Sequence, residues 1–262
     1  MESEILFSRK SMFGVTCAEI TLNRPGKGNA ITMAMIRQLD SILSEIEADR
    51  TGDIRAVVIR GQGRFFCTGG DIESWGELSP LEMGRTWILR GIEALSRLAA
   101  LPQPVIAAIT GHALGGGLEL ALSADLRIAV KSAKLGTPEV TLGMISGWMG
   151  VRRLSEIVGV SRARHLTLLG TPITADVALD WGLITAVAED GEDLERQLNG
   201  WLERLCANGP AAMALTKGIL ATAHTDLREH HATAAGQALA TEDCQEGVRA
   251  FREKRNPVFR NR

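Results

Sequence analysis

The sequence contains no tyrosine, and aromatic residues make up only 4% of its 262 residues. A tyrosine general acid is therefore excluded anywhere in the chain. The four cysteines are far apart and form no CxxC pair: Cys17, Cys67, Cys206 and Cys244. This spacing excludes a zinc knuckle and a redox dithiol of the usual kind. Scattered thiols favour free cysteines in a reducing compartment, so we expect a cytoplasmic protein.

Neither sign of charge dominates, because 29 Lys and Arg residues stand against 31 Asp and Glu residues. No basic block occurs, so the chain is not expected to bind nucleic acid. No apolar run is long enough to span a membrane, and no membrane association is expected. The segment MESEILFSRK has the pattern of neither a secretory signal nor an Arg-rich transit peptide. The GxSxG and HExxH motifs are absent, which counts against a serine esterase and a zincin.

The sequence does contain an α/β pattern in its first half. Short Val- and Ile-rich runs predict buried strands at 15–22, 56–60, 105–109 and 126–130. Thr32 is a plausible N-cap for a helix to about residue 49, and further helices are expected from Pro80 to about residue 100 and over 115–123. The second half is mostly helical, with helices predicted at 148–158, 161–169, 175–181, 192–207, 210–223 and 227–254. We therefore predict an α/β core over 1–199 and a helical C-terminal region over 200–262.

A glycine run opens the third of these helices. Gly115, Gly116 and Gly117 precede LELAL, and Glu119 follows Gly116 by three residues. Amides at a helix start have no intrahelical partner, and glycine lets a ligand approach them closely. Glu119 lies on nearly the same helix face as Gly116, so a carbonyl bound there would be within its reach. The alternative is a close-packed turn with a solvated acid.

Two further segments carry similar residues. In RFFCTGGDIESW, Thr68, Gly69 and Gly70 form a tight turn, and Asp71 can cap the helical turn that follows. The tight turn supplies a second set of backbone amides. Two donors on one oxygen would form an oxyanion hole. Glu139 lies in KLGTPEVTLG, where Pro138 and Gly143 bound a short run expected to be extended. A plain strand-to-helix turn and a solvated loop acid are the alternatives.

The sequence resembles the crotonase superfamily of enoyl-CoA hydratases and isomerases from about residue 20 to 255. The matching stretches are LNRPGKGNAI, FFCTGGDI, ITGHALGGGLELALSADLRIA, LGTPEVTLG, GTPITADVALDWGLI and GVRAFREKRNPVF. Together their order and spacing are highly specific. The resemblance implies a spiral of β-β-α repeats with a helical C-terminal trimerisation region. It also implies a homotrimer or a dimer of trimers that binds acyl-CoA thioesters and stabilises an enolate.

Carried over residue by residue, the resemblance makes Gly70 and Gly116 the oxyanion amides. Glu119 would orient and deprotonate a water, and Glu139 would share that water and supply the α-carbon proton. Both positions hold glutamate, which favours reversible syn hydration of a 2-enoyl-CoA to a 3-hydroxyacyl-CoA. Neither metal nor cofactor is expected, since coenzyme A is part of the substrate. The alternatives are an isomerase or hydratase-lyase on a bulky or aromatic acyl-CoA and a non-catalytic binding protein.

The resemblance also points to residues that would bind coenzyme A. In the first turn these are Arg24 and Lys27, whose charges suit phosphates. In the second turn they are Thr68, Asp71 and Ile72. Near the C-terminus, Phe251 and Lys254 match an aromatic residue and a lysine that complete the adenine end from a neighbouring subunit. Helix packing for Phe251 and a solvated charge for Lys254 are the alternatives.

The chain departs from the family pattern after LGM. Hydratases of the family continue with a Pro-Gly-small-Gly-Gly run, whereas this chain has ISGWMG. The resemblance places that loop beside the acyl pocket, so Trp148 and Met149 are predicted to line it. Trp148 would then select an unusual acyl group. The alternative is that Trp148 begins a helix and packs into the core.

Overall fold

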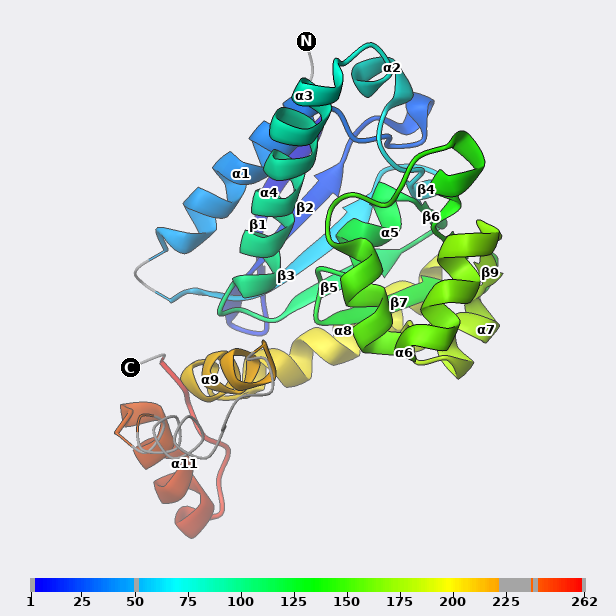
Figure 1. The fold of residues 1–262 in the computed structure, drawn as a ribbon. Helices are drawn as coiled ribbons and strands as arrows, with labels where there is room; N and C mark the ends of the chain where they lie inside the picture. Colours follow the sequence, from blue (N-terminus) through cyan, green and yellow to red (C-terminus); the bar gives the residue numbers. More distant parts are fainter. Residues whose placement is uncertain (1–2, 50–51, 222–236, 238–239, 261–262) are drawn as a thin grey trace.

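The computed structural model describes residues 3–49, 52–221, 237 and 240–260. Six strands form one sheet in the order β1-β2-β3-β5-β7-β10 (Figure 1). Their bounds are Ile5–Met12, Val15–Leu22, Ile54–Gly61, Val105–Ile109, Leu126–Val130 and Ala186–Ala188. Neighbouring strands from β2 to β10 in this order pair in parallel. In contrast, β1 and β2 pair antiparallel and are joined through Phe13 and Gly14, both at positive φ. Two residues at positive φ are typical of a tight hairpin turn.

A second sheet of four short strands has the order β4-β6-β8-β9. Their bounds are Phe65–Cys67, His112–Leu114, Lys134–Gly136 and Ile173–Thr174. The chain passes from β3 to β4, from β5 to β6 and from β7 to β8. Successive strands therefore alternate between the two sheets and follow the same order in each. The turns that follow β4, β6 and β8 therefore come close together.

The core lies between the larger sheet and the helices α1 (Met33–Glu47) and α4 (Leu89–Ala100). Every residue of β5 is buried, as its sequence VIAAI predicts for a central parallel strand. The predicted N-cap is confirmed, because the Thr32 side chain accepts a hydrogen bond from the Met35 N–H at 3.1 Å. The Cys17 and Cys206 sulfurs lie 3.7 Å apart in the core.

Several predicted elements differ in detail. The helix expected from Pro80 consists of α3 (Pro80–Glu82), the π-helical η2 (Met83–Ile88) and α4. The run expected to be extended after Thr137 is the 3₁₀ helix η3 (Pro138–Leu142), because Pro138 suits a first helical position. The helices predicted at 148–158 and 161–169 are one element, α6 (Gly150–Leu169), interrupted at Gly159 with a φ of 78°. Trp148 thus precedes the helix instead of beginning it.

The C-terminal half contains α7 (Ala175–Asp180), α8 (Gly191–Ala207), α9 (Pro210–Ala221) and α11 (Glu242–Glu253). In Figure 1, α9 and α11 lie beside the sheets rather than over them, although α8 runs unbroken across residue 200. Residues 227–236, 238 and 239 of the helix predicted at 227–254 lie outside the described residues, and α11 is its described helical part. No helix in the described part of the chain is long and apolar enough to cross a membrane.

Candidate active site

Two glycine turns bring a pair of backbone amides together. Gly70 follows β4, and Gly116 begins α5 (Gly116–Ala121) after Gly115, which has a φ of 54°. A Cβ placed on Gly116 would lie 3.4 Å from the Gly70 nitrogen, so the two residues are neighbours. Neither N–H donates to an acceptor in the described residues. Both are therefore available to one oxygen of a ligand.

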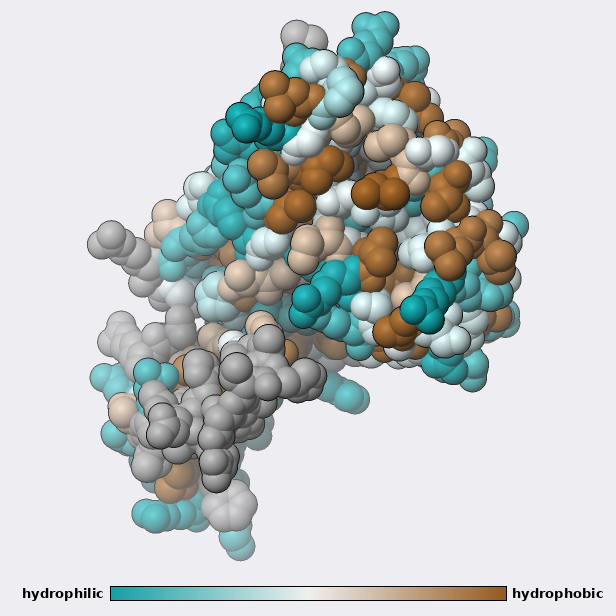
Figure 2. All heavy atoms as spheres, viewed as in Figure 1, coloured by the Kyte–Doolittle hydropathy of each residue, from teal (hydrophilic) through white to brown (hydrophobic). Residues whose placement is uncertain are grey.

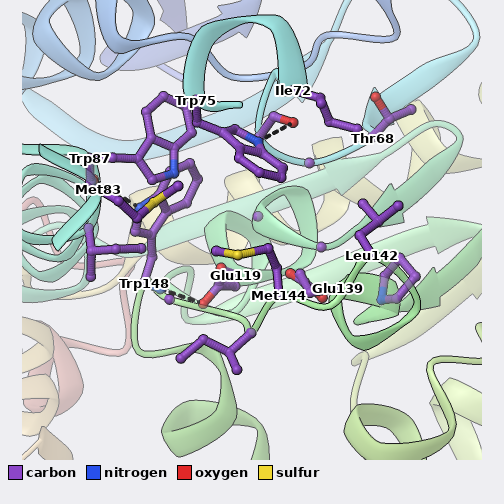
Figure 3. A pocket seen from close by; sticks show the side chains of 18 residues that line it. Thr68, Ile72, Trp75, Met83, Trp87, Glu119, Glu139, Leu142, Met144 and Trp148 are labelled. Carbon is purple, nitrogen blue, oxygen red and sulfur yellow. Dashed lines mark hydrogen bonds between the residues drawn. The ribbon is translucent and has the colours of Figure 1, made fainter. Parts of the chain in front are cut away.

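Glu119 is held in the interior on α5, where it is 2% exposed. Its Oε1 accepts a hydrogen bond from the N–H of Trp148 at 2.8 Å (Figure 3). The same oxygen accepts a second one from the N–H of Gly150, also at 2.8 Å. Burial raises the pKa of Glu119 to about 7, and the charge of Glu139 adds to that rise. The two N–H donors oppose it, because they favour the ionised form. Glu119 can therefore gain or lose a proton near neutral pH.

Glu139 approaches the same space from η3. A Cβ on Gly115 would lie 3.0 Å from Glu139 Oε1, which places this carboxylate beside the glycine turn. Its Oε2 is buried and has no hydrogen-bond partner within the described chain. Burial raises the pKa of Glu139, while a hydrogen bond from Ser146 opposes the rise. Two nearby carboxylates with raised pKa values favour a state in which one holds a proton.

The carboxylates and the glycine turns line one cavity of about 110 Å³. Its polar side is formed by Gly70, Gly116, Glu119 and Glu139, which are four of the predicted site residues. The remaining lining is mostly apolar and includes Trp75, Met83, Trp87, Ile88, Leu142, Met144, Ile145 and Trp148. In Figure 3 the carboxylates point toward this space from separate elements, and the three indole rings line another side. Apart from Trp148, this apolar lining was not predicted from the sequence, because it comes from short helices and loops that carry no regular apolar pattern.

Trp148 both packs in the core and lines the cavity, so its two predicted roles are compatible. It is 2% exposed, and its indole N–H donates to the Trp87 carbonyl at 3.2 Å. The two indole rings lie 5.4 Å apart at an angle of 42°. A Cβ on Gly91 would come within 2.1 Å of the Trp148 indole, and one on Gly116 within 2.6 Å. The indole therefore occupies space that these two glycines leave open.

Met149 differs from the prediction, because it is not among the residues that line the cavity. Its φ of 68° is in the left-handed region and its side chain is 41% exposed. The residue instead forms the turn that aims the flanking N–H groups of Trp148 and Gly150 at Glu119. The left-handed backbone at Met149 bends the chain just before α6, and the Met149 side chain lies at the surface.

The five residues of the two turns that are predicted to bind coenzyme A are placed in three different ways. Thr68 and Ile72 line the cavity. Arg24 and Asp71 instead pair with each other at 2.7 Å, and Asp71 also caps α2 (Ile72–Trp75). Burial raises the pKa of Asp71, but Arg24 outweighs it and holds the pKa below its usual range. Lys27 remains at the surface, 3.2 Å from Glu73.

The last two predicted residues lie in the C-terminal region, away from the cavity (Figure 1). Phe251 belongs to α11, and its side chain lies outside the described part of the structure. Lys254 follows α11 with a φ of 54° and is exposed. Within the described ranges, no group of three or more His, Cys, Asp or Glu side chains is placed to hold a metal ion.

Comparisons with known proteins find relatives that match this chain along nearly its whole length. The family model described as Enoyl-CoA hydratase/isomerase matches residues 13–262. The short-chain-enoyl-CoA hydratase of Clostridium acetobutylicum is 37% identical over 252 residues, which cover 94% of this chain and 95% of that protein. The 2,3-dehydroadipyl-CoA hydratase of Escherichia coli is 35% identical over 270 residues, which cover 99% of this chain and 100% of that protein. An enoyl-CoA hydratase of Bacillus anthracis matches in structure with a TM-score of 0.91 at 34% identity, over 99% of this chain and 100% of that one.

The fold and these matches define a crotonase-fold enzyme that processes acyl-CoA thioesters. The chain belongs to the enoyl-CoA hydratase/isomerase family, as its sequence motifs predicted.

Proposed function

We propose that this enzyme adds water reversibly to the double bond of a 2-enoyl-CoA and forms a 3-hydroxyacyl-CoA. One observation carries the proposal: two carboxylates with raised pKa values and two unpaired backbone N–H groups line the same cavity. An isomerase needs to move a proton but does not need to activate water. The presence of two carboxylates therefore favours hydration over isomerisation.

In the proposed reaction, the thioester oxygen accepts hydrogen bonds from the N–H groups of Gly70 and Gly116. Ionised Glu119 takes a proton from water as the water oxygen bonds to the β-carbon. Protonated Glu139 donates its proton to the α-carbon, and charge passes transiently onto the thioester oxygen. The net addition is one water, and proton exchange between the carboxyl groups restores the starting state. Each N–H donor would contribute about 3 kcal/mol to lowering the barrier.

The cavity also supports a proposal for the acyl group. Trp148 is fixed by the Trp87 carbonyl and by the space at Gly91, so it cannot move aside without breaking this packing. We therefore place a short acyl chain against Trp148.

The resemblance adds proposals for assembly and for the coenzyme end. We propose that each subunit folds as a spiral of β-β-α turns. Its helical C-terminal region would join the subunits into a trimer or a dimer of trimers. The matched strand order of the two sheets supports the spiral. Exposed Leu168, Leu169 and Leu220 offer apolar surface for subunit contacts. Analytical ultracentrifugation tests the assembly.

Lys27, Thr68 and Ile72 would bind coenzyme A, and Phe251 and Lys254 would act from a neighbouring subunit. The protein would be cytoplasmic.

A spectrophotometric hydration assay on a series of 2-enoyl-CoA thioesters tests the reaction. Glu119→Gln and Glu139→Gln keep the side-chain shape but remove the acid and base functions, so each is expected to lower kcat by about 10²–10⁴-fold. Glu203→Gln is a matched control, because Glu203 is exposed on α8. Full activity in both site variants would contradict the two-carboxylate mechanism. No turnover of any thioester by the parent enzyme would contradict hydration itself.

A further inference from the structure

Arg153 connects three parts of the structure next to the proposed site. It lies near the start of α6, and its Nη1 donates to the Trp148 carbonyl at 3.0 Å. Its Nη2 reaches the Leu95 carbonyl and the Ser96 hydroxyl of α4, both at 3.4 Å. The planar guanidinium can make these contacts together because its donors point in fixed directions. Arg153 thus ties the turn before α6 to α4.

The same turn carries the N–H groups that hold Glu119. Trp148 donates its N–H to Glu119 Oε1 and accepts from Arg153 at its carbonyl. The backbone of this one residue is therefore held at both ends. Gly150, the second donor to Glu119, is close enough that a Cβ on it would lie 2.3 Å from Glu119 Cγ. A small shift of the turn would consequently disturb both hydrogen bonds to Glu119.

Arg153 also supplies the positive charge that acts on Glu119. From η3, Glu139 favours the protonated form of Glu119, while from α6 Arg153 favours the ionised form. From α6, Glu156 also interacts with Arg153. From α4 the groups facing Arg153 are neutral, namely the Leu95 carbonyl and the Ser96 hydroxyl. Partial burial of Arg153 weakens solvent screening, so its charge acts over a longer range.

We propose that Arg153 is a positioning residue for the reaction, which fixes the 148–150 turn over Glu119 and favours the ionised form of this base. The role rests on the proposed function, because it concerns a base that activates water. Arg153 does not line the cavity, so it acts through the Trp148 backbone and through its charge.

The pH dependence of kcat separates this role from a purely structural one. Without Arg153 the pKa of Glu119 is expected to rise, since a favourable charge for its ionised form is lost. In Arg153→Gln the acid limb of the kcat profile should therefore move up by as much as about one pH unit, which would lower kcat near pH 7 about fivefold, because half of Glu119 already holds a proton there. The KM should change little. Arg153→Lys keeps the charge but not the fork, so its acid limb should return toward that of the parent enzyme while kcat stays reduced.

Arg152→Gln is the matched control. Arg152 is the adjacent residue, but its side chain is 63% exposed and pairs with Glu156 on the surface of α6. Its profile should match that of the parent enzyme. If Arg153→Gln lowers the melting temperature but leaves the acid limb in place, the proposed role is wrong. If the acid limb of Arg153→Lys lies at the same pH as that of Arg153→Gln, the charge of Arg153 does not contribute to the ionisation of Glu119.

A second measurement does not depend on turnover. Titration of ¹³C-labelled glutamate carboxyls by NMR, with the Glu119 signal assigned by its loss in Glu119→Gln, reports the ionisation of Glu119 directly. The signal should titrate at higher pH in Arg153→Gln than in the parent enzyme or Arg152→Gln. If the parent enzyme hydrates no thioester but this shift occurs, the proposed function fails while the effect of Arg153 on Glu119 stands. An unchanged titration in an active enzyme overturns the role of Arg153 alone.

Discussion

At the scale of single residues, Trp148 shows how a large side chain is placed beside a small cavity. Its indole lies against Gly91 and Gly116, and its N–H is bound by the Trp87 carbonyl. Trp87 belongs to the π-helical segment η2, a kind of irregularity that is frequent at functional sites. The position of the Trp148 ring thus depends on two glycines and on an irregular helix that are distant in sequence.

We expect Trp148→Ala to change which substrates are used. Loss of the indole enlarges the cavity, so kcat/KM for longer 2-enoyl-CoA chains should rise relative to that for the shortest one. The variant should also lose about 3–5 kcal/mol of stability, because a large buried side chain is removed. Hydration rates across a chain-length series, with melting curves, measure both effects.

Trp181→Ala is the control for this substitution. Trp181 packs edge-on against His165 at a ring distance of 5.4 Å and does not line the cavity. Its replacement should leave the chain-length profile as it is. An unchanged profile in Trp148→Ala would show that Trp148 does not limit the acyl chain.

The raised pKa of Glu119 has a consequence for stability as well as for catalysis. The folded protein binds a proton at Glu119 with a pKa of about 7, above the value of 4.5 expected when the chain is unfolded. The tighter binding of this proton stabilises the folded state. The stabilisation is fully present below pH 4.5 and is lost as the pH rises through 7. The free energy of unfolding of the parent enzyme should therefore fall between pH 5 and 8 by on the order of 2–3 kcal/mol more than that of Glu119→Gln.

Urea unfolding of both proteins across this pH range checks the prediction. The amide oxygen of glutamine can still accept hydrogen bonds from the N–H groups of Trp148 and Gly150. The difference between the two proteins therefore reports the effect of the proton on Glu119. Parallel stability curves for the two proteins would mean that Glu119 titrates near its ordinary pKa.

At the scale of elements, Arg24 and Asp71 join the first glycine-containing turn to the start of α2. Asp71 is 6% exposed and accepts from the Glu73 N–H at 3.0 Å, while Arg24 also bonds the Ala30 carbonyl. These contacts hold the segment that carries Gly70 and Ile72. Arg24 therefore supports the site from inside the fold.

We expect Arg24→Gln to lower the free energy of unfolding by about 2–4 kcal/mol, because it leaves Asp71 buried without its ion pair. Lys27→Gln should cost less than about 0.5 kcal/mol, since the Lys27 to Glu73 pair is exposed. Of the two variants, only Lys27→Gln is expected to raise KM for acyl-CoA while leaving KM for the acyl-pantetheine analogue unchanged. Equal destabilisation by both variants would contradict this assignment.

The elements predicted correctly are those whose burial is written in a local pattern. The Val- and Ile-rich runs of β2, β3, β5 and β7 are confirmed, and so is the cap of α1. The sequence did not predict β1, an exposed edge strand, or the short strands of the second sheet, whose pairing comes from residues distant in sequence. The π-helical η2 and the 3₁₀ helix η3 were also missed, because their shape depends on how they pack.

For the site, the glycine turns and the two carboxylates were predicted from motif order, and the structure brings them to one cavity. Their roles in the reaction remain predictions. The Arg24 to Asp71 pair was not expected, because charges in a turn can serve a ligand or each other equally well. Trp75, Trp87 and the contact of Arg153 with the Trp148 carbonyl likewise follow only from the folded chain.

At the scale of the whole molecule, Arg55 links the larger sheet to the C-terminal region. It lies on β3, is 4% exposed and donates to three backbone carbonyls beyond the sheet. These belong to Asn208 at 2.9 Å, Phe259 at 3.4 Å and Cys206 at 3.5 Å. Lys217 of α9 makes a further link to Asp125 at 2.6 Å. A few polar contacts therefore set the position of α9 and the chain end relative to the sheets.

Arg55→Met should keep apolar volume in place but leave these carbonyls without their donor. We expect a loss of about 2–4 kcal/mol, because unsatisfied buried acceptors are costly, and a melting temperature lower by about 5–10 °C. Limited proteolysis should cut the chain beyond α8 faster than in the parent enzyme. Arg204→Gln, at an exposed position on α8, should behave like the parent enzyme in both measurements. Because the proposed trimer uses the C-terminal region, sedimentation of Arg55→Met should also show a smaller assembly. A variant that melts, digests and sediments like the parent enzyme would mean that Arg55 does not hold this region in place.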